Sequence, residues 1–266
     1  TTHIVRNGID LGVFDNAQYR NTDAAKRDYQ GLDVQGAYRV GATLEMQAQW
    51  TVQLQNDGTF EGESANNPAI PSIIGDYPEI YVPSRSFPDG RVDEFQRHKV
   101  RAWATYTFDM KQYGAVDVSP LYRYSSPRTY SLVASGVPLS AIQIARNPGY
   151  ARLPTSQTLY FGARGSEEFA SIHLLDVAVS YRVPVWHTMS PWVKLEVLNA
   201  LNHQKLVSWN TTITADMNGP KDENGLPTTY IKSASFGTAT GPASYPRPRA
   251  GADGGRTFLM SAGVRF

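Results

Sequence analysis

Apolar and polar residues alternate one by one along much of this chain. Between residues 44 and 55 the even positions are all apolar and the odd positions all polar, beginning with Leu44, Glu45, Met46 and Gln47. Successive side chains of a β-strand point to opposite faces, so this segment has one apolar and one polar face. The alternation therefore predicts a strand that lies between an apolar and an aqueous environment.

The same pattern recurs along the chain and predicts about eight antiparallel strands. They are expected at residues 2–20, 26–38, 44–55, 98–108, 115–134, 171–183, 192–209 and 256–266. The alternating runs have about ten residues or more, the length that a tilted strand needs to cross a bilayer. Strands of soluble sheets are usually about half as long.

Short and long connections take turns between these strands. The short ones lie near residues 39–43, 109–114 and 184–191, and the long ones near 57–97, 135–170 and 210–255. In an up-and-down sheet, all short turns then fall at one end and all long loops at the other. Outer-membrane barrels have this asymmetry, with short periplasmic turns and long extracellular loops. We therefore predict an all-β, antiparallel, up-and-down transmembrane β-barrel.

Aromatic residues are consistent with this orientation. Several lie on the apolar face of their strand, next to a short turn or to the carboxyl terminus, where a periplasmic aromatic girdle is expected. The predicted girdle consists of Tyr38, Tyr106, Phe108, Tyr181 and Phe266, with Trp186 and Trp192 flanking the same end.

Composition narrows the classes of protein. The net charge is +1, so no basic excess favours nucleic acid as a partner. The absence of cysteine excludes disulfides and thiolate metal sites. The sequence contains no run of about 18 apolar residues, so it predicts no transmembrane helix. A soluble β-sandwich also has alternating strands, but it explains neither the strand lengths nor the unequal connections.

Two stretches near the carboxyl terminus resemble the TonB-dependent transporters. The penultimate strand starts at Pro191-Trp-Val-Lys-Leu and runs into a kink formed by Asn199, Ala200, Leu201 and Asn202. The terminal strand from Arg256 ends in an aromatic residue, as in that family. Further stretches resemble the Oar-like branch: Tyr19-Arg-Asn-Thr-Asp, Arg27-Asp-Tyr-Gln, Arg97-His-Lys-Val-Arg-Ala-Trp, Tyr245-Pro-Arg-Pro-Arg and Gly254-Gly-Arg-Thr-Phe-Leu-Met.

The resemblance implies an outer-membrane receptor of Gram-negative bacteria that imports a ligand with energy from the TonB complex. Members have about 22 strands and a plug, so residues 1–266 look like the carboxyl-terminal part of such a barrel. A plug and a TonB box are expected upstream of Thr1. Other implied partners are membrane lipid, lipopolysaccharide, an imported ligand of unknown chemistry and the barrel-assembly machinery. That machinery would read Phe258, Met260, Ala262, Val264 and Phe266.

A small self-closed barrel, acting as an adhesin or a structural envelope protein, is the alternative. Strand pairing distinguishes the two architectures. If the strand at residues 2–20 pairs with that at 256–266, the barrel closes on itself. If both strands have free edges, the chain is part of a larger wall, because unpaired edges do not persist in lipid.

Candidate chemistry is sparse, and neither an enzyme nor a bound cofactor is expected. His173 and Asp176 form the only close pair of histidine and carboxylate, which we interpret as neighbouring residues on the polar face. A loop with Asp216, Asn218 and Asp222 has oxygen ligands suited to calcium. It lacks the EF-hand spacing, so a solvated loop is preferred and no metal is predicted.

Two further groups of residues are candidates for binding. The loop at residues 70–88 contains Tyr77, Tyr81 and Phe87, which are expected either to form an outward-facing ligand surface or to pack on neighbouring loops. Charged residues on the polar faces of the strands would line a watery lumen, contact the plug or mark a substrate path. They are Lys99, Arg101, Asp117, Arg123, Lys194 and Glu196.

Overall fold

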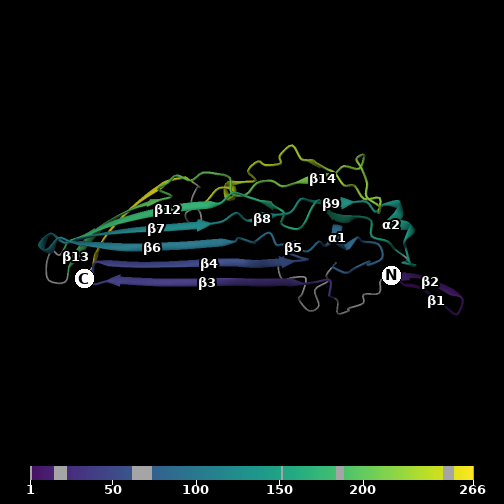
Figure 1. Cartoon of the computed structure of the whole chain (residues 1–266), viewed down its shortest axis with the longest axis horizontal. Coiled ribbons are helices and arrows are strands. Elements are labelled where there is room, and N and C mark those ends of the chain that lie inside the picture. Colours follow the sequence, from purple (N-terminus) through teal and green to yellow (C-terminus); the bar gives the residue numbers. More distant parts are fainter. Residues whose placement is uncertain are drawn as a thin grey trace.

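The protein is built around one large antiparallel sheet, as a computed structural model of the chain shows (Figure 1). The structure describes residues 2–14, 23–61, 74–150, 152–183, 189–247 and 255–265. Strands make up 51% of it and helices 6%, so the predicted all-β class is confirmed. The sheet has eight strands, seven of them long, in the order β16-β13-β12-β7-β6-β4-β3, with the short β5 paired to β4.

The long strands follow one another along the chain and across the sheet, as expected for an up-and-down arrangement. Their lengths are 9 to 15 residues, close to the alternating runs of about ten residues or more. Their bounds are β3 Arg27–Val40, β4 Leu44–Gly58, β6 His98–Asp109, β7 Ala115–Ser125, β12 Ile172–Arg182, β13 Ser190–Leu198 and β16 Thr257–Arg265, and the short β5 is Gly90–Arg91.

Strand register places the apolar positions of all seven long strands on one face. Residues directly opposite each other in a sheet share a face. One row of opposite residues crosses the whole sheet through Val40, Leu44, Tyr106, Val118, Val179, Leu195 and Met260. The alternation within single strands therefore becomes a continuous apolar face across the sheet, with a polar face behind it.

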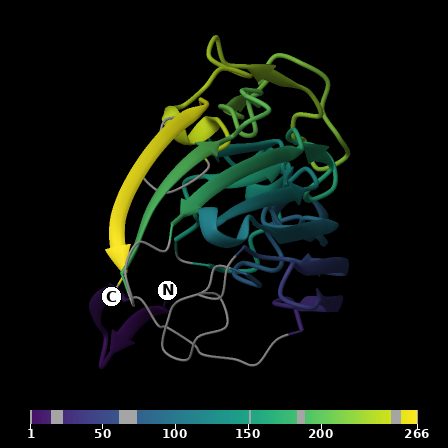
Figure 2. The same ribbon diagram turned by 90° about the vertical axis from the view of Figure 1, so that its left-hand side faces the viewer.

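Short turns and long connections lie at opposite ends of the sheet (Figure 1). The turn between β6 and β7 contains the 3₁₀-helix η2, Lys111–Tyr113, and ends at Gly114. Gly114 has a φ of +96°, and a Cβ there would lie 2.0 Å from the carbonyl oxygen of Arg182, so this turn requires glycine. Viewed from this end, the sheet bends into an arc (Figure 2).

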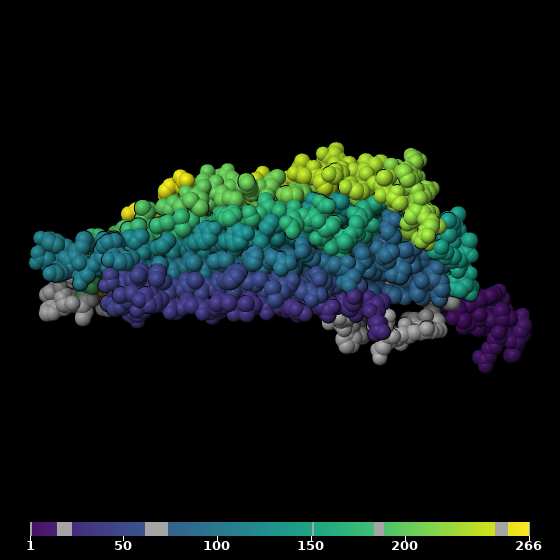
Figure 3. All heavy atoms as spheres, viewed as in Figure 1, coloured from purple at the N-terminus to yellow at the C-terminus, as the bar shows by residue number. Residues whose placement is uncertain are grey.

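The long connections contain small elements of their own. These are α1 Pro83–Ser86, β8 Thr129–Tyr130, β9 Val133–Val137, α2 Ala141–Ala145, β10 Gln157–Tyr160, β11 Glu167–Glu168, β14 Ile213–Ala215, β15 Tyr230–Lys232 and η3 Pro242–Ser244. Of these, α1, α2, β9 and β14 lie toward the other end of the molecule (Figure 1), which is the broader end in the space-filling view (Figure 3). We call the part formed by the long connections the loop layer.

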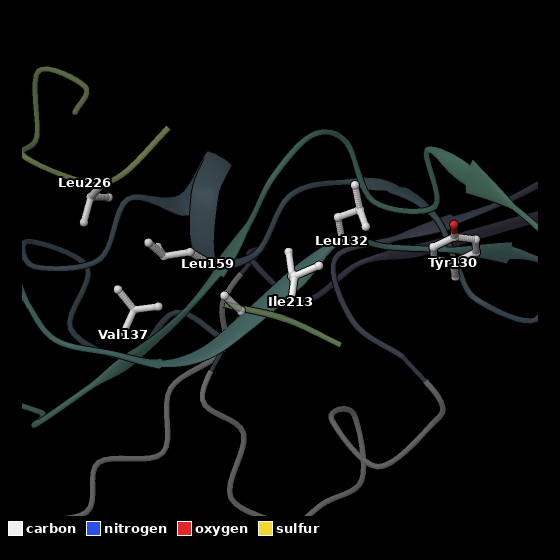
Figure 4. Packing of buried hydrophobic residues seen from close by; sticks show 7 residues of the cluster. Tyr130, Leu132, Val137, Leu159, Ile213 and Leu226 are labelled. Carbon is white, nitrogen blue, oxygen red and sulfur yellow. The ribbon is translucent and has the colours of Figure 1, made fainter. Parts of the chain in front are cut away.

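The main hydrophobic core lies in the loop layer and not against the sheet (Figure 4). Segments from two of the long connections contribute to it, since β9 and β10 pair with each other and β14 packs against β9. Leu159 is fully buried at its centre. The cluster consists of Tyr130, Leu132, Ala134, Val137, Leu159, Ile213 and Leu226.

The prediction of one sheet strand at residues 2–20 is wrong. The described part of this stretch forms a separate hairpin of β1, Thr2–Arg6, and β2, Ile9–Phe14. Asn7 and Gly8 join the two strands with φ values of +52° and +75°, the left-handed conformation of a tight two-residue hairpin turn. The hairpin is not paired with β16, so it does not close the sheet.

Two other predicted strands are too long. The strand expected at residues 115–134 ends at Ser125, shortly before Pro127, which has no amide hydrogen for a sheet. The chain then continues into β8 and β9. The strand expected at residues 192–209 ends at Leu198, because Asn199 has a φ of +51° and turns the chain.

Candidate functional site

The apolar face of the sheet is an unusual surface of the part of the chain that the structure describes. Many of its side chains are exposed although the loop layer of the same chain buries an ordinary core. Tyr38 is 62% exposed, Leu195 46% and Met260 75%. Soluble proteins rarely leave such a large contiguous apolar patch uncovered. The surface therefore requires an apolar environment or an apolar partner.

Four of the five predicted girdle residues lie at the short-turn end of this face. The rings of Tyr106 and Phe108 are 4.4 Å apart, and the hydroxyl of Tyr181 donates a 2.8 Å hydrogen bond to the carbonyl oxygen of Tyr113. Tyr38 lies on β3, opposite Met46. Phe266 and Trp186 lie outside the described residues, whereas Trp192 lies on the polar face against Gly263.

A second aromatic group lies on the same face at the loop end, and the sequence analysis missed it. The indole nitrogen of Trp50 donates to Nδ1 of His98 over 3.3 Å. On β12, Nδ1 of His173 lies 3.1 Å from the hydroxyl of Tyr122, and its ring lies 4.8 Å from the tilted ring of Tyr124. The signal was present, because all five residues occupy apolar-face positions of their strands, and four of them lie within four residues of a long connection.

His173 and Asp176 do not form a catalytic pair. They lie three positions apart on β12 and therefore point to opposite faces. The interpretation that both belong to the polar face is wrong for His173, which lies in the second aromatic group. Asp176 accepts hydrogen bonds from Arg123, over 2.6 Å, and from the backbone amide of Asn199, over 2.8 Å.

The predicted kink after β13 is present as a local turn. Asn199 is fully buried, and its side chain accepts from the amide of His203 and donates to that residue's carbonyl oxygen. Asn202 also has a positive φ, and its amide donates to the carbonyl oxygen of Asn199. Because Asp176 accepts from Asn199, the turn is anchored to the polar face of β12.

The polar face contains a cleft of about 400 Å³ near the loop end. Lys99, Arg101 and Arg123 line it from β6 and β7, and Arg247 lines it from the segment that precedes β16. These cations include three of the six charged residues that the sequence placed on this face. The other three lie elsewhere on it: Asp117 pairs with Arg182 over 3.5 Å, and Lys194 pairs with Glu196 over 2.8 Å.

The candidate ligand-binding aromatics come together in the loop layer. The rings of Tyr77 and Tyr81 are 5.8 Å apart, and those of Tyr81 and Phe87 are 6.0 Å apart. Tyr150, which the sequence analysis did not single out, joins them at 5.1 Å from Tyr77. A small pocket of about 120 Å³ borders Tyr81 and Phe87. Of the predicted loop 70–88, residues 70–73 lie outside the described part.

The carboxylates of the loop considered for calcium accept hydrogen bonds from other groups of the protein. Asp216 accepts from the amide of Asn218 and the hydroxyl of Thr229. Asp222 accepts from two backbone amides and from Arg85, over 2.9 Å. Within the described ranges, no group of three or more histidine or acidic residues is arranged to hold a metal ion.

Arg164 connects separate segments of the loop layer. It is only 4% exposed, and it donates to Glu61 over 2.6 Å and to the carbonyl oxygens of Thr59 and Pro88. Asp93 lies beside this network, and its amide donates to Glu61. Although Asp93 as a residue is exposed, desolvation of its carboxyl group and the charge of Glu61 raise the pKa of that group to about 6.

We expect Asp93→Asn to stabilise the loop layer at pH 8 and not at pH 4. An acid whose pKa is higher in the folded state stabilises folding below its unfolded pKa, here 3.8, and this contribution is lost as the pH rises through about 6. The uncharged amide avoids that loss. Melting temperatures at both pH values measure the effect, expected to be a few degrees. An equal gain at pH 4 would exclude titration of Asp93 as its cause.

The residues proposed to carry the assembly signal lie on the edge strand β16. Phe258, Met260, Ala262 and Val264 alternate along its apolar face, opposite apolar positions of β13. Phe258 is 65% exposed. The last member, Phe266, lies outside the described residues. The predicted alternation of apolar residues is therefore present in β16. Recognition of these residues by the barrel-assembly machinery stays a prediction.

Comparison of this chain with protein-family models, with curated proteins and with solved structures gives no match. Among the described residues, no helix is long and apolar enough to span a membrane.

Proposed function

We propose that this chain forms part of the wall of an outer-membrane receptor of the TonB-dependent type. In this proposal the apolar face of the sheet contacts lipid and the polar face lines the lumen. The loop layer is extracellular and the short turns are periplasmic. The wall binds a ligand from outside, and the TonB complex provides the energy for import.

The observation that carries the proposal is the register of the sheet. Seven strands align their apolar residues into one exposed face, between an aromatic group at each end. On β7, Tyr124 of the second group lies eight positions after Val116, which is level with Tyr181, a span of roughly 25 Å along the strand. Counted with both ends, the stretch from Val116 to Tyr124 is nine residues long, within the about 9–11 residues that a tilted strand needs to cross a bilayer.

The free edges of the sheet favour a wall larger than the described strands. β3 and β16 end the sheet, and in the part of the chain that the structure describes neither has a second pairing partner. Unpaired backbone groups are costly in lipid, so each edge requires a further strand. This supports the larger receptor over the small self-closed adhesin, although both would use the same lipid-facing surface.

Ligand capture is assigned to the aromatic cluster of the loop layer. Tyr77, Tyr81 and Phe87 are all half-buried, so their rings are held in place while part of each remains accessible. Aromatic residues on a rigid support contribute contact area with little loss of conformational freedom. Such a cluster suits a ligand with flat or apolar surfaces.

The orientation in the membrane can be tested by labelling single cysteines, because the chain contains none. We expect Ala234→Cys, in the loop layer, to react with a membrane-impermeant maleimide on intact cells. Gln112→Cys, in the turn between β6 and β7, should react only after the outer membrane is permeabilised. Recovery of the protein in the soluble fraction, or labelling of Gln112→Cys on intact cells, would contradict the proposal.

The energy source and the architecture need separate controls. The purified gene product should bind the periplasmic domain of TonB. Failure to bind, together with disulfide formation between cysteines introduced along the edges of β3 and β16, would instead support the self-closed barrel.

A further inference from the structure

We propose that the cleft on the polar face binds a small polyanion that carries clustered carboxylate or phosphate groups. The cleft is independent of the aromatic cluster in the loop layer. The proposal concerns the chemistry of the sheet and holds whether or not the sheet lies in a membrane.

The positive charge of the cleft is not balanced by the protein. Arg101 and Arg123 lie directly opposite each other on β6 and β7, and like charges in that position destabilise a sheet. Arg123 pairs with Asp176 over 2.6 Å, but neither Lys99 nor Arg101 has an ion-pair partner among the residues that the structure describes. Both oxygens of Asp176 are already occupied, by Arg123 and the amide of Asn199.

Arg123 also retains unused hydrogen-bonding capacity. Its Nη2 bonds to Asp176, whereas its enclosed Nε has no partner in the described part of the chain. Enclosed polar atoms nearly always have a partner, because leaving one unpaired costs free energy. An anion bound to the guanidinium groups would neutralise the opposed arginines and supply further acceptor oxygens, which suit the planar arginine fork.

The shape of the cleft favours a small solute. Pro246 and Arg247, from the segment before β16, line it together with the strand residues, so the site combines a floor on the sheet with a wall from a distant part of the chain. Pro246 is buried, which holds this segment in place. A volume of about 400 Å³ is within the range of small-molecule sites. Gln49 and Thr51 add neutral polar groups from β4.

Binding can be measured by titration calorimetry on the intact gene product in an uncharged detergent. Citrate and inorganic triphosphate serve as probes and distinguish carboxylate from phosphate preference. We expect at least one to bind, with an affinity that falls as the salt concentration rises. The double variant Lys99→Gln/Arg101→Gln should bind that probe roughly 10-fold or more weakly, because charged hydrogen bonds are lost.

A matched control removes the same charge from the same face. Arg39→Gln/Arg265→Gln lies outside the cleft and should leave the affinity unchanged. In the absence of a probe, Arg101→Gln should not lower the melting temperature, because it removes the repulsion from Arg123. If Arg101 had a purely structural role, its replacement would lower the melting temperature. The proposal is overturned if neither probe binds, if Lys99→Gln/Arg101→Gln binds normally, or if the control pair weakens binding equally.

Discussion

Met46→Arg is expected to lower the free energy of unfolding by about 2–4 kcal/mol when the protein is folded in lipid vesicles. Met46 lies on the apolar face of β4, between Tyr38 and Ala104. In the proposed orientation, an arginine at this position of the apolar face would contact lipid, where a charge is costly. Urea titration of the vesicle-bound gene product measures the loss.

The adjacent residue provides the control. Gln47 lies on the polar face of the same strand, opposite Ala37 and Trp103. Gln47→Arg adds the same side chain at nearly the same depth but leaves it in water, so its effect should be within about 0.5 kcal/mol. If Met46→Arg is as harmless as Gln47→Arg, the apolar face is not in contact with lipid.

Leu159→Ala is expected to destabilise the loop layer by about 2–5 kcal/mol. Leu159 is fully buried in the hydrophobic cluster of that layer, and its truncation leaves a cavity among residues from separate connections. Faster hydrogen exchange of the amides of β9 and β10 would report the loss. The central amides of β6 and β7 should exchange at an unchanged rate, because their sheet does not depend on this core.

Leu201→Ala makes the same chemical change at a residue that is 58% exposed, so it should have little effect on these amides. Equal acceleration by both substitutions would mean that the loop layer is loosely packed. Acceleration in β6 and β7 as well would mean that the sheet and the loop layer unfold as one unit. Either result would contradict the described separation between the buried core and the exposed apolar face.

The sheet was predictable because its signal is local. Each strand carries its alternation within its own residues, so Leu44 to Leu54 could be assigned to one face without knowledge of a neighbour. The order of short and long connections then indicated the up-and-down arrangement. The hairpin of β1 and β2 was missed because alternation was followed through Asn7 and Gly8, although this dipeptide is a strong turn signal.

The loop layer was not predictable in the same way. Leu159 comes from one connection and Ile213 from another, and their neighbours show no long periodic run. Their burial depends on contacts between distant segments, which local patterns do not contain. The cleft was predictable only in part. The sequence placed Lys99 and Arg101 on the polar face, but the approach of Arg247 to them results from tertiary structure.

The shared register of the seven strands also restricts how the length of this protein can change. Inserting or deleting one residue within a strand would turn all later side chains of that strand to the opposite face. Lys99 and Arg101 would then exchange faces with Val100 and Ala102, their neighbours on β6. Length variation among homologous chains should therefore occur in the loop layer, with single-residue changes inside the strands confined to bulges such as that between Gln30 and Gly31.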